Sequence, residues 1–531
     1  MTRARICVSV CARTVAESVQ LVEDARPSAQ LFELRLDCLD PQELDAMLRL
    51  IDAETSGRGA SLLNGETSFI FTFRPLEQGG ARALTTDERY ALWRRLIPAL
   101  RSSPREAFAD IELDLLEGAG ASFITDSLTR DNVSEGRDGL QLICSRHDFE
   151  GVPENLEDIY ERMTRTPASL FKIALTAHSV SDCIPVFRLL ERAGREGRAL
   201  IAVAMGGAGV LTRILGPSRG SYLTYGSPQR ERATAPGQLT AEELRRLYRV
   251  EKIDAETFVT GLVGSPVAHS LSPHMHNAAF AARALNGVYI PFEVGDAAEF
   301  VRRIVHPRTR EFAWNLRGLS VTAPHKTGVL KHLDWVEPKA SQIGAVNTLA
   351  VEDDALHGYN TDAEAALKPL QDLIELRGVR VGVIGAGGAA RALLWGLRER
   401  GAHATVFARN AERARAAAKD FDARTASIED ARFDKFEVVV NATPLGTRGA
   451  REQETPASAA QLRGVRVVYD LVYNPSETRL MREARAAGCE VVGGLPMLVA
   501  QAAGQFKLWT GLDAPVDSMR EAAETRLASA V

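Results

Sequence analysis

The first half of the chain repeats one pattern eight times, and this repetition constrains the fold more than any other feature of the sequence. Within residues 1–250, short apolar runs rich in β-branched and aromatic residues alternate with segments of helical length. The runs are RICVSVCA (5–12), LFELRLD (31–37), SFIFTFR (68–74), FADIELDL (108–115), LQLICSRHDF (140–149), LFKIAL (170–175), ALIAVAM (199–205) and SYLTYG (221–226). This alternation predicts a (β/α)8 barrel. A doubly wound open sheet is the alternative, but such a sheet usually has fewer strands.

Charged side chains share one face of the second predicted strand. In LFELRLD, Glu33, Arg35 and Asp37 alternate with leucines, and the two-residue period of a strand places all three on the same side. A charged inner face near the carboxyl end of a barrel strand is costly unless it binds something. Other polar groups occur at or after strand ends: Arg74, His147, Lys172, Arg213 and TAPGQ (234–238). The barrel mouth is therefore predicted to bind a small anionic substrate.

Lys172 lies inside the apolar run FKIAL, and this placement allows two interpretations. Desolvation favours the neutral amine, which is a nucleophile toward a ketone. Alternatively, the side chain extends to the barrel rim and keeps its charge in water. His147, in SRHDF at an earlier strand end, favours a catalytic role for the pair.

The segments ELRLD, TFR, SRHDF, FKIAL, GVLTRILG and TAPGQ resemble type I 3-dehydroquinate dehydratase, in order and spacing, over nearly all of residues 5–250. The resemblance implies a Schiff base between Lys172 and the C3 ketone of the substrate. It implies that His147 removes the C2 proton and returns a proton to the leaving C1 hydroxyl, which gives 3-dehydroshikimate. Arg213 is expected to clamp the substrate carboxylate. The substrate-binding positions implied are Ser9, Glu33, Arg35, Arg74, Arg213, Thr234 and Gln238.

One position departs from that family. The family commonly has a glutamate just before Gly-Gly that orients the histidine, and here RPLEQGG places Gln78 at that position. An amide can hydrogen-bond an imidazole but cannot stabilise the imidazolium by charge. We therefore expect Glu112 or Asp114, which alternate on the fourth predicted strand, to supply the missing carboxylate.

The second half contains a glycine-rich turn between a buried strand and a helix, in VRVGVIGAGGAARALLWGL (379–397). Gly385, Gly387 and Gly388 would let the backbone approach a pyrophosphate at the helix N-terminus. A glycine turn in an ordinary βα unit is the alternative. The next strand ends about 20 residues on, where NAD enzymes place an acid. Arg409 and Arg413 occur there instead, which favours NADP, although Arg413 could equally be a solvated charge at a helix start.

Four short polar segments precede this turn in the sequence: GSPVAHSLSPHMHN (264–277), LSVTAPHK (319–326), IGAVNT (343–348) and GYNTDA (358–363). Each alone could be a turn or a helix cap. Together they collect hydroxyl, amide and carboxylate groups suited to a polyol.

These segments, with NATPLGT, DLVYNP and GGLPMLVAQAAGQFKLWTG, resemble shikimate dehydrogenase over essentially all of residues 258–531. The resemblance implies that Lys326 exchanges the proton at the C3 oxygen during hydride transfer, and that Asp362 holds the lysine. Ser320 and Ala365 replace the asparagine and glycine usual in the family. The implied shikimate-binding residues are Ser270, Ser272, Thr322, Asn347, Tyr473 and Gln501. The implied cofactor contacts are Gly385, Ala386, Gly387, Gly388, Ala389, Ala408, Arg409, Asn410, Arg413, Thr443, Leu471 and Gly494.

The chain is thus predicted to be an α/β protein in which an N-terminal (β/α)8 barrel precedes a two-domain α/β dehydrogenase. The expected domains are the dehydratase barrel (1–250), a shikimate-binding domain (257–363, to which 488–531 returns) and a Rossmann-type NADP domain (364–487). The two activities are consecutive, since the product of the first is the substrate of the second. One rival hypothesis is a quinate dehydrogenase that uses NAD, and another is a non-catalytic sensor of pathway intermediates.

The amino-acid composition excludes few classes of protein but favours a cytoplasmic enzyme. The formal charge is −5, and we see no Lys/Arg block typical of nucleic-acid binding and no membrane-spanning apolar run. The N-terminus shows no signal-peptide core. The six cysteines show no zinc spacing, so we expect no metal and six reduced, structural thiols. The oligomeric state is left open.

Overall fold

The computed structural model describes residues 4–55, 67–101, 106–129, 139–429 and 431–529. By internal contacts the chain divides into two compact units. The first comprises Met1–Thr257 with the short segments Phe292–Val294 and Glu311–Ala313, and the second comprises the remainder.

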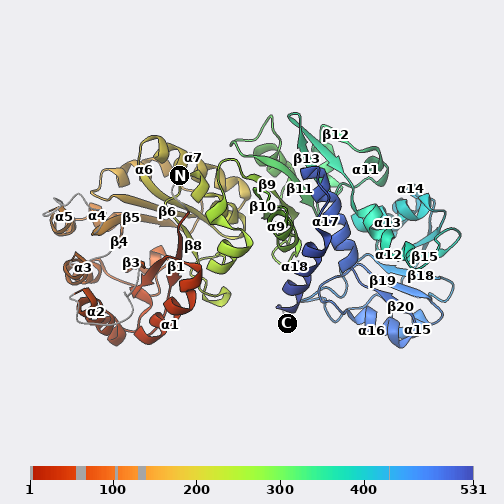
Figure 1. The fold of residues 1–531 in the computed structure, drawn as a ribbon, viewed down its shortest axis with the longest axis horizontal. Coiled ribbons are helices and arrows are strands. Elements are labelled where there is room, and N and C mark those ends of the chain that lie inside the picture. The colour runs from red at the N-terminus through yellow and green to blue at the C-terminus, as the bar shows by residue number, and fades with distance from the viewer. Residues whose placement is uncertain (1–3, 56–66, 102–105, 130–138, 430, 530–531) are drawn as a thin grey trace. The chain divides into compact units, whose positions relative to one another are not determined.

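The first unit is a barrel of parallel strands with helices outside it (Figure 1). The strands are hydrogen-bonded in the order β7-β6-β5-β4-β3-β2-β1-β8, and a bridge between Leu200 and Ser221 joins the two ends. The predicted barrel is confirmed. The strands are β1 (Ile6–Val10), β2 (Leu31–Arg35), β3 (Ser68–Thr72), β4 (Ala107–Glu112), β5 (Leu140–Asp148), β6 (Leu170–Thr176), β7 (Ala199–Met205) and β8 (Thr224–Gly226). The main helices are α1 (Val15–Ala25), α2 (Pro41–Thr55), α3 (Thr86–Arg101), α4 (Leu113–Glu117), α5 (Ala121–Thr129), α6 (Leu156–Thr164), α7 (Cys183–Arg195) and α8 (Val210–Leu215).

The barrel interior changes from apolar to polar along the strands. Near the amino ends, a buried cluster includes Cys7, Leu31, Ile70, Phe108, Ile143, Leu170 and Ile201. Residues two positions later on the same strands also point inward, because side chains alternate across a strand. These are Ser9, Glu33, Thr72, Asp110, Ser145, Lys172 and Val203, all buried. The apolar layer closes one end of the barrel, and the polar layer forms the floor of a site at the other.

Cys11 and Cys38 form a disulfide, so the expectation of six reduced thiols is wrong for this pair. The two residues follow β1 and β2, which pair in parallel and end side by side, and their Cα atoms lie 5.4 Å apart. The two cysteines are 27 residues apart in the sequence, and nothing in that spacing indicated that they lie close together. The other four cysteines are free and buried.

The second unit contains two sheets. The first has the order β10-β9-β11-β13-β14-β12, in which β9 and β11 are parallel and β13 is antiparallel to both β11 and β14. Its strands are β9 (Phe258–Gly264), β10 (Gly287–Glu293), β11 (Leu316–Val321), β12 (Trp335–Val336), β13 (Thr348–Glu352) and β14 (Ala355–Tyr359). Helices α9 (Ser272–Ala282), α17 (Leu495–Thr510) and α18 (Val516–Ala528) contribute to one apolar cluster with this sheet. The C-terminal segment therefore packs with the start of the unit, and α10 (Ala297–Phe300), α11 (Pro338–Ile343) and α12 (Asp362–Gln371) complete this part.

The second sheet is wholly parallel, with the order β17-β16-β15-β18-β19-β20. This is the 3-2-1-4-5-6 order of a dinucleotide-binding fold, whose strand order reverses between β15 and β18. The predicted Rossmann-type fold is confirmed. The elements are β15 (Arg380–Ile384), α13 (Gly388–Glu399), β16 (His403–Phe407), α14 (Ala411–Asp420), β17 (Arg424–Ala426), β18 (Val438–Asn441), α15 (Ala459–Leu462), β19 (Val467–Asp470), α16 (Arg479–Ala486) and β20 (Glu490–Val492).

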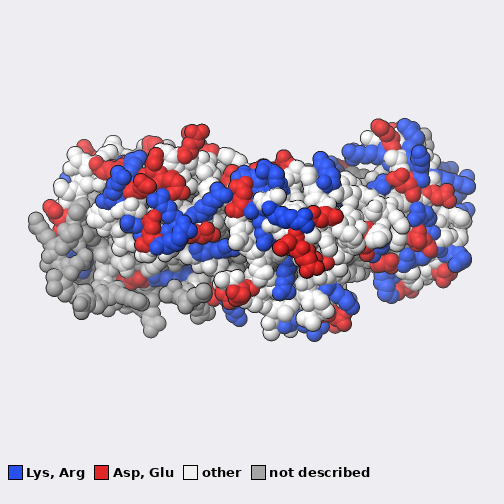
Figure 2. Space-filling view, turned by 90° about the horizontal axis from the view of Figure 1, so that it is seen from above, with Lys and Arg blue, Asp and Glu red and all other residues white. Residues whose placement is uncertain are grey.

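Basic and acidic side chains are interspersed over the face of the molecule shown in Figure 2. In the described part of the chain, no helix combines the length and the apolar character needed to cross a lipid bilayer.

Candidate active sites

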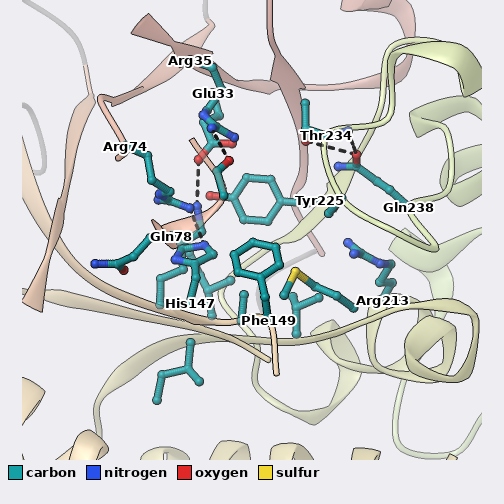
Figure 3. Close-up of a pocket in the computed structure, with 18 residues that line it drawn as sticks. Glu33, Arg35, Arg74, Gln78, His147, Phe149, Arg213, Tyr225, Thr234 and Gln238 are labelled. Carbon is teal, nitrogen blue, oxygen red and sulfur yellow. Dashed lines mark hydrogen bonds and ion pairs between the residues drawn. The ribbon is translucent and has the colours of Figure 1, made fainter. Parts of the chain in front are cut away.

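The barrel contains a cavity of about 60 Å³ at the carboxyl ends of its strands. Many of its lining side chains are charged or polar. In Figure 3, Glu33, Arg74 and His147 approach one another on one side of the cavity, and Arg213, Thr234 and Gln238 lie on the other. Nine residues predicted from the sequence line it: Glu33, Arg35, Arg74, Gln78, His147, Lys172, Arg213, Thr234 and Gln238.

Lys172 is held between two buried carboxylates. Its Nζ donates to Glu33 Oε1 at 2.7 Å and to Asp110 Oδ2 at 2.8 Å. Burial alone would raise the pKa of each carboxyl, but the charges of Lys172 and Arg74 outweigh burial and lower both values. Lys172 therefore has two anionic partners, of which Asp110 was not identified from the sequence.

His147 is neutral in this arrangement. Burial, followed by the nearby charges of Arg74 and Lys172, lowers its pKa well below the ordinary value. Its Nε2 contacts Arg74 Nη1. A guanidinium can only donate, so Nε2 is the acceptor and Nδ1 carries the proton. Arg74 in turn donates to Asp110 at 2.9 Å, which links the histidine to the lysine site.

Arg213 is buried without a counter-ion. It is 2% exposed, it forms no ion pair among the described residues, and burial lowers its pKa to about 10. An uncompensated guanidinium in a cavity is costly unless a ligand supplies the negative charge. Arg213 therefore suits a substrate carboxylate.

Arg35, by contrast, is already paired. Its guanidinium donates to both carboxylate oxygens of Asp37, at 2.9 and 2.7 Å. Asp37 does not continue the face of β2, as the period-two pattern suggested, because the chain leaves the strand at Arg35 and turns through Leu36–Cys38. Because of this turn, the Asp37 carboxylate accepts from the Arg35 guanidinium and also from Ala81 N, the latter at 2.9 Å.

Gln78 lines the cavity, but its amide is engaged away from His147. Its Nε2 donates to Asp114 Oδ1 at 3.3 Å. Asp114 itself lies beyond the end of β4, in α4, and forms an ion pair with Arg89 at 2.7 Å. The expectation that Asp114 alternates on the strand and serves His147 is therefore wrong.

Glu112 does not contact His147 either. It is fully buried and lies 3.4 Å from Arg89 Nη1 and 3.9 Å from Arg74 Nε. Burial raises its pKa to about 7 despite these two cations. In the described structure, no carboxylate accepts a hydrogen bond from Nδ1 of His147, which has no partner.

The remaining predicted residues of this half lie around the same site. Ser9 is not among the cavity-lining residues, and its hydroxyl donates to Glu33 Oε2 at 2.7 Å, so it positions that carboxylate. Thr234 N donates to Gln238 Oε1 at 2.7 Å, within the segment that follows β8. Their contacts with substrate stay predictions.

The second unit contains a larger cavity, of about 450 Å³. It lies where residues of both sheets meet. Predicted shikimate-binding and catalytic residues line it together with predicted cofactor residues: Ser270, Ser272, Thr322, Lys326, Asp362, Tyr473, Gln501, Ala389, Thr443, Leu471 and Gly494.

Lys326 and Asp362 form the ion pair predicted from the sequence. Lys326 Nζ lies 2.5 Å from Asp362 Oδ2, and Asn347 Nδ2 donates to the other carboxylate oxygen at 2.8 Å. Asn360 Oδ1 accepts from the backbone N–H of Asp362 at 3.0 Å. The carboxylate is thus fixed at the start of α12 with one oxygen on the lysine.

Two glycines bring the dinucleotide-binding turn close to this pair. Gly385 has φ +123°, a backbone conformation that residues other than glycine rarely adopt. A Cβ on Gly388 would lie 2.9 Å from Lys326 Cδ. The turn after β15 therefore packs directly against the lysine, which suits a cofactor that must deliver hydride beside it.

The other predicted cofactor residues lie on the loops after β15 and β16. Arg409 and Arg413 are exposed, and neither guanidinium forms an ion pair with another described residue. Asn410 caps α14, because its side chain accepts from Arg413 N. The turn after β15 holds Ala386 and Gly387, and Ala408 directly follows β16.

Several residues of these sites were not identified from the sequence. Asp110 lies on the same face as Glu112, so the period-two pattern could have indicated it. In the second unit, Ser320, which the sequence marked only as a departure from the family, accepts from Tyr289 Oη at 2.8 Å and donates to Gln505 at 2.7 Å. Ser320 and Gln505 both line the cavity. Among the described residues, no group of His, Cys, Asp and Glu side chains has an arrangement that could hold a metal ion.

Different known families match the two units of the chain. Residues 6–255 match the family described as type I 3-dehydroquinase. Residues 262–349 match the shikimate dehydrogenase substrate binding domain, and residues 494–524 the shikimate 5'-dehydrogenase C-terminal domain. Residues 380–458 match a family described as NADP oxidoreductase, coenzyme F420-dependent. The class defined by fold and site is a lyase joined to an NADP-type dehydrogenase.

One relative spans both halves. The bifunctional 3-dehydroquinate dehydratase/shikimate dehydrogenase, chloroplastic, of Arabidopsis thaliana is 33% identical over 95% of this chain and 82% of its own length. The shikimate dehydrogenase (NADP(+)) of Moorella thermoacetica is 42% identical over 50% of this chain and 93% of its own. The shikimate dehydrogenase (NADP(+)) of Methanothermobacter thermautotrophicus is 38% identical over 51% of this chain and 97% of its own length. The chain belongs to the family of bifunctional 3-dehydroquinate dehydratase/shikimate dehydrogenases.

Proposed function

We propose that this chain dehydrates 3-dehydroquinate to 3-dehydroshikimate through Lys172, and then reduces 3-dehydroshikimate to shikimate with NADPH through Lys326 and Asp362. The observation that carries the proposal is that each half holds a lysine–carboxylate pair inside a cavity. The cytoplasmic location and the domain boundaries predicted from the sequence stay predictions.

In the barrel, Lys172 passes one proton to a neighbouring carboxylate, Glu33 or Asp110, and its amine then adds to the C3 ketone. The adduct loses its C3 oxygen as water and leaves an iminium. The iminium acidifies the C2 proton, which His147 removes. His147 then returns the proton to the C1 hydroxyl, and a second water leaves. Because Arg74 occupies Nε2 in the free enzyme, substrate binding has to draw Arg74 away before that nitrogen can act as the base. Arg213 holds the carboxylate during both steps.

Borohydride reduction tests the covalent step. With 3-dehydroquinate present, reduction of the iminium is expected to leave a stable adduct on Lys172, found by mass spectrometry of the digested protein. An unmodified Lys172 peptide, with dehydratase turnover intact, would refute the Schiff base.

The imidazole of His147 is expected to stay neutral well below pH 6.5, because burial and the charges of Arg74 and Lys172 lower its pKa. An unperturbed histidine is half protonated at about pH 6.5. Nitrogen-15 NMR, with the signal assigned by its absence in His147→Asn, is expected to show the neutral ring from pH 8 to 6. A midpoint at pH 6.5 or higher would contradict the arrangement described here.

In the second unit, NADPH supplies the hydride for the C3 carbonyl. Lys326 donates a proton to the C3 oxygen as that oxygen gains charge, and Asp362 keeps the ammonium aimed at it. Ser270, Ser272 and Tyr473 line the cavity and suit the carboxylate of the substrate. The glycine turn at Gly388 suits the pyrophosphate of the cofactor. The exposed guanidinium of Arg409, one strand away, suits the 2′-phosphate.

Replacing Arg409 by serine is expected to raise the KM for NADPH about 10- to 100-fold and to leave the KM for NADH unchanged. The reason is the loss of charge-assisted hydrogen bonds to the 2′-phosphate, worth roughly 1.5–3 kcal/mol. Arg415→Ser is the matched control, because it removes an exposed arginine from α14 two residues beyond Arg413, on another side of the helix. Equal effects of Arg409→Ser on both cofactors would exclude this role.

A further inference from the structure

Tyr225 carries a buried hydroxyl that has no hydrogen-bond partner in the described part of the chain. The residue lies on β8 opposite Cys7 of β1, lines the dehydratase cavity and is 6% exposed. Among the described residues, no donor or acceptor reaches its oxygen. A buried tyrosine hydroxyl usually has a partner, so an unpaired one in a substrate cavity indicates that the ligand supplies it.

The hydroxyl is directed at the catalytic groups. Nζ of Lys172 lies 4.4 Å from the centre of the Tyr225 ring, a cation–π contact. In Figure 3 the phenol points across the cavity toward Glu33, Arg74 and His147. A substrate carbon bonded to Nζ therefore lies close to this ring and its hydroxyl.

Many other polar groups around the cavity already have partners. Arg35 is bound to Asp37, and Arg74 is bound to His147 and Asp110. Glu33 accepts from Lys172 and Ser9, and Thr234 and Gln238 are bonded to each other. Of the uncommitted groups, Arg213 suits the carboxylate. Tyr225 is left as a neutral donor, since burial, followed by the charge of Glu33, raises its pKa well above the ordinary value.

We propose that Tyr225 is a catalytic hydrogen-bond donor of the dehydratase, and that its hydroxyl donates to the C3 oxygen of the substrate while Lys172 adds to C3. This inference rests on the proposed role of Lys172 as the nucleophile. As the bond from Nζ to C3 forms, the C3–oxygen π bond breaks and negative charge develops on the oxygen. A fixed donor aimed at that charge stabilises the transition state.

The step balances without any further reactant. The ammonium and the ketone give an iminium and water, and both protons of that water come from the ammonium of Lys172. Tyr225 keeps its own proton at the end. Tyr225 therefore contributes only to the addition of Nζ to C3 and to the loss of the C3 oxygen as water. It has no part in removal of the C2 proton by His147.

Tyr225→Phe removes only the oxygen. Because that oxygen is unpaired in the free enzyme, the substitution leaves no buried group without a partner, and the melting temperature is expected to stay the same or rise. Rapid-quench trapping with borohydride is expected to show iminium formation on Lys172 slowed roughly 10- to 100-fold, as for loss of one donor to a developing oxyanion.

Tyr222→Phe is the matched control. Tyr222 is three residues earlier, and its hydroxyl bonds Arg5 and Glu106 instead of facing the cavity. Its loss is expected to leave the rate of iminium formation unchanged. A second readout is the deuterium isotope effect at C2, which is expected to fall toward 1 in Tyr225→Phe because iminium formation becomes limiting. A change that slowed all steps equally would leave that effect unaltered.

The outcomes separate this inference from the proposed function. If the wild type gives no adduct on Lys172, the Schiff base and the role of Tyr225 both fail. If the wild type gives the adduct and Tyr225→Phe forms it at the same rate with the same isotope effect, only the role of Tyr225 is refuted. A slower trapping rate with the lowered isotope effect supports it.

Discussion

Replacing Lys172 by arginine is expected to lower dehydratase turnover by at least about 10⁴-fold and to leave dehydrogenase turnover unchanged. Arginine keeps the positive charge that Glu33 and Asp110 need, so the buried carboxylates stay paired. A guanidinium does not lose its proton in proteins and cannot form the iminium. The substitution therefore removes the nucleophile with little change in charge.

Lys172→Met is the contrasting variant, because it removes the charge as well. Two buried carboxylates then lose a partner, and breaking a buried ion pair costs about 3–5 kcal/mol. We expect Lys172→Met to have a lower melting temperature than Lys172→Arg, although both lack dehydratase turnover. Dehydrogenase activity of the same preparations, measured with shikimate and NADP, is the internal control. Substantial dehydratase turnover in folded Lys172→Arg would contradict the covalent mechanism.

Replacing Lys326 by methionine is expected to lower dehydrogenase kcat about 10²- to 10⁴-fold, the usual contribution of a positioned proton donor. Among the described residues, Asn347 is then left as the side-chain donor to the Asp362 carboxylate. Binding of NADPH is expected to change little, because Gly388 of the glycine turn faces Cβ, Cγ and Cδ of the lysine, which methionine also provides or mimics in shape. The measurement is kcat for 3-dehydroshikimate reduction together with the dissociation constant of NADPH by fluorescence.

Lys331→Met is the control for this substitution, since it removes an exposed lysine from the same part of the chain. It is expected to keep both kcat and cofactor affinity. Dehydratase activity is expected to be unaffected by either variant. A Lys326→Met enzyme with normal kcat would show that another group moves the proton.

The period-two pattern predicted much of the barrel site, because a strand that alternates faces needs only sequence spacing to assign its inner residues. Glu33 was assigned to the inner face on this basis, whereas Lys172 and His147 were predicted from their positions within or at the end of an apolar strand; all three line the cavity. Where the chain leaves a strand, the same pattern fails. Asp37 and Asp114 both lie just beyond strand ends, and a turn redirects each side chain.

Contacts between strands distant in sequence could not be predicted. The ion pair between Lys172 and Asp110 joins residues 62 positions apart, and it gives the lysine a second anionic partner beside Glu33. Tyr225 was read only as part of an apolar strand, since tyrosine is common in strands. Its unpaired hydroxyl is visible only when the whole barrel surrounds it.

The central claim is that one chain performs two consecutive reactions at two sites. The direct test is a coupled assay in which wild-type protein receives 3-dehydroquinate and NADPH, with shikimate and NADP quantified together. The account predicts equal amounts of shikimate and NADP from the wild type, none from Lys172→Arg, and recovery of both in Lys172→Arg when 3-dehydroshikimate is supplied. Wild-type protein that accumulates 3-dehydroshikimate without oxidising NADPH, or that forms no product, would contradict it.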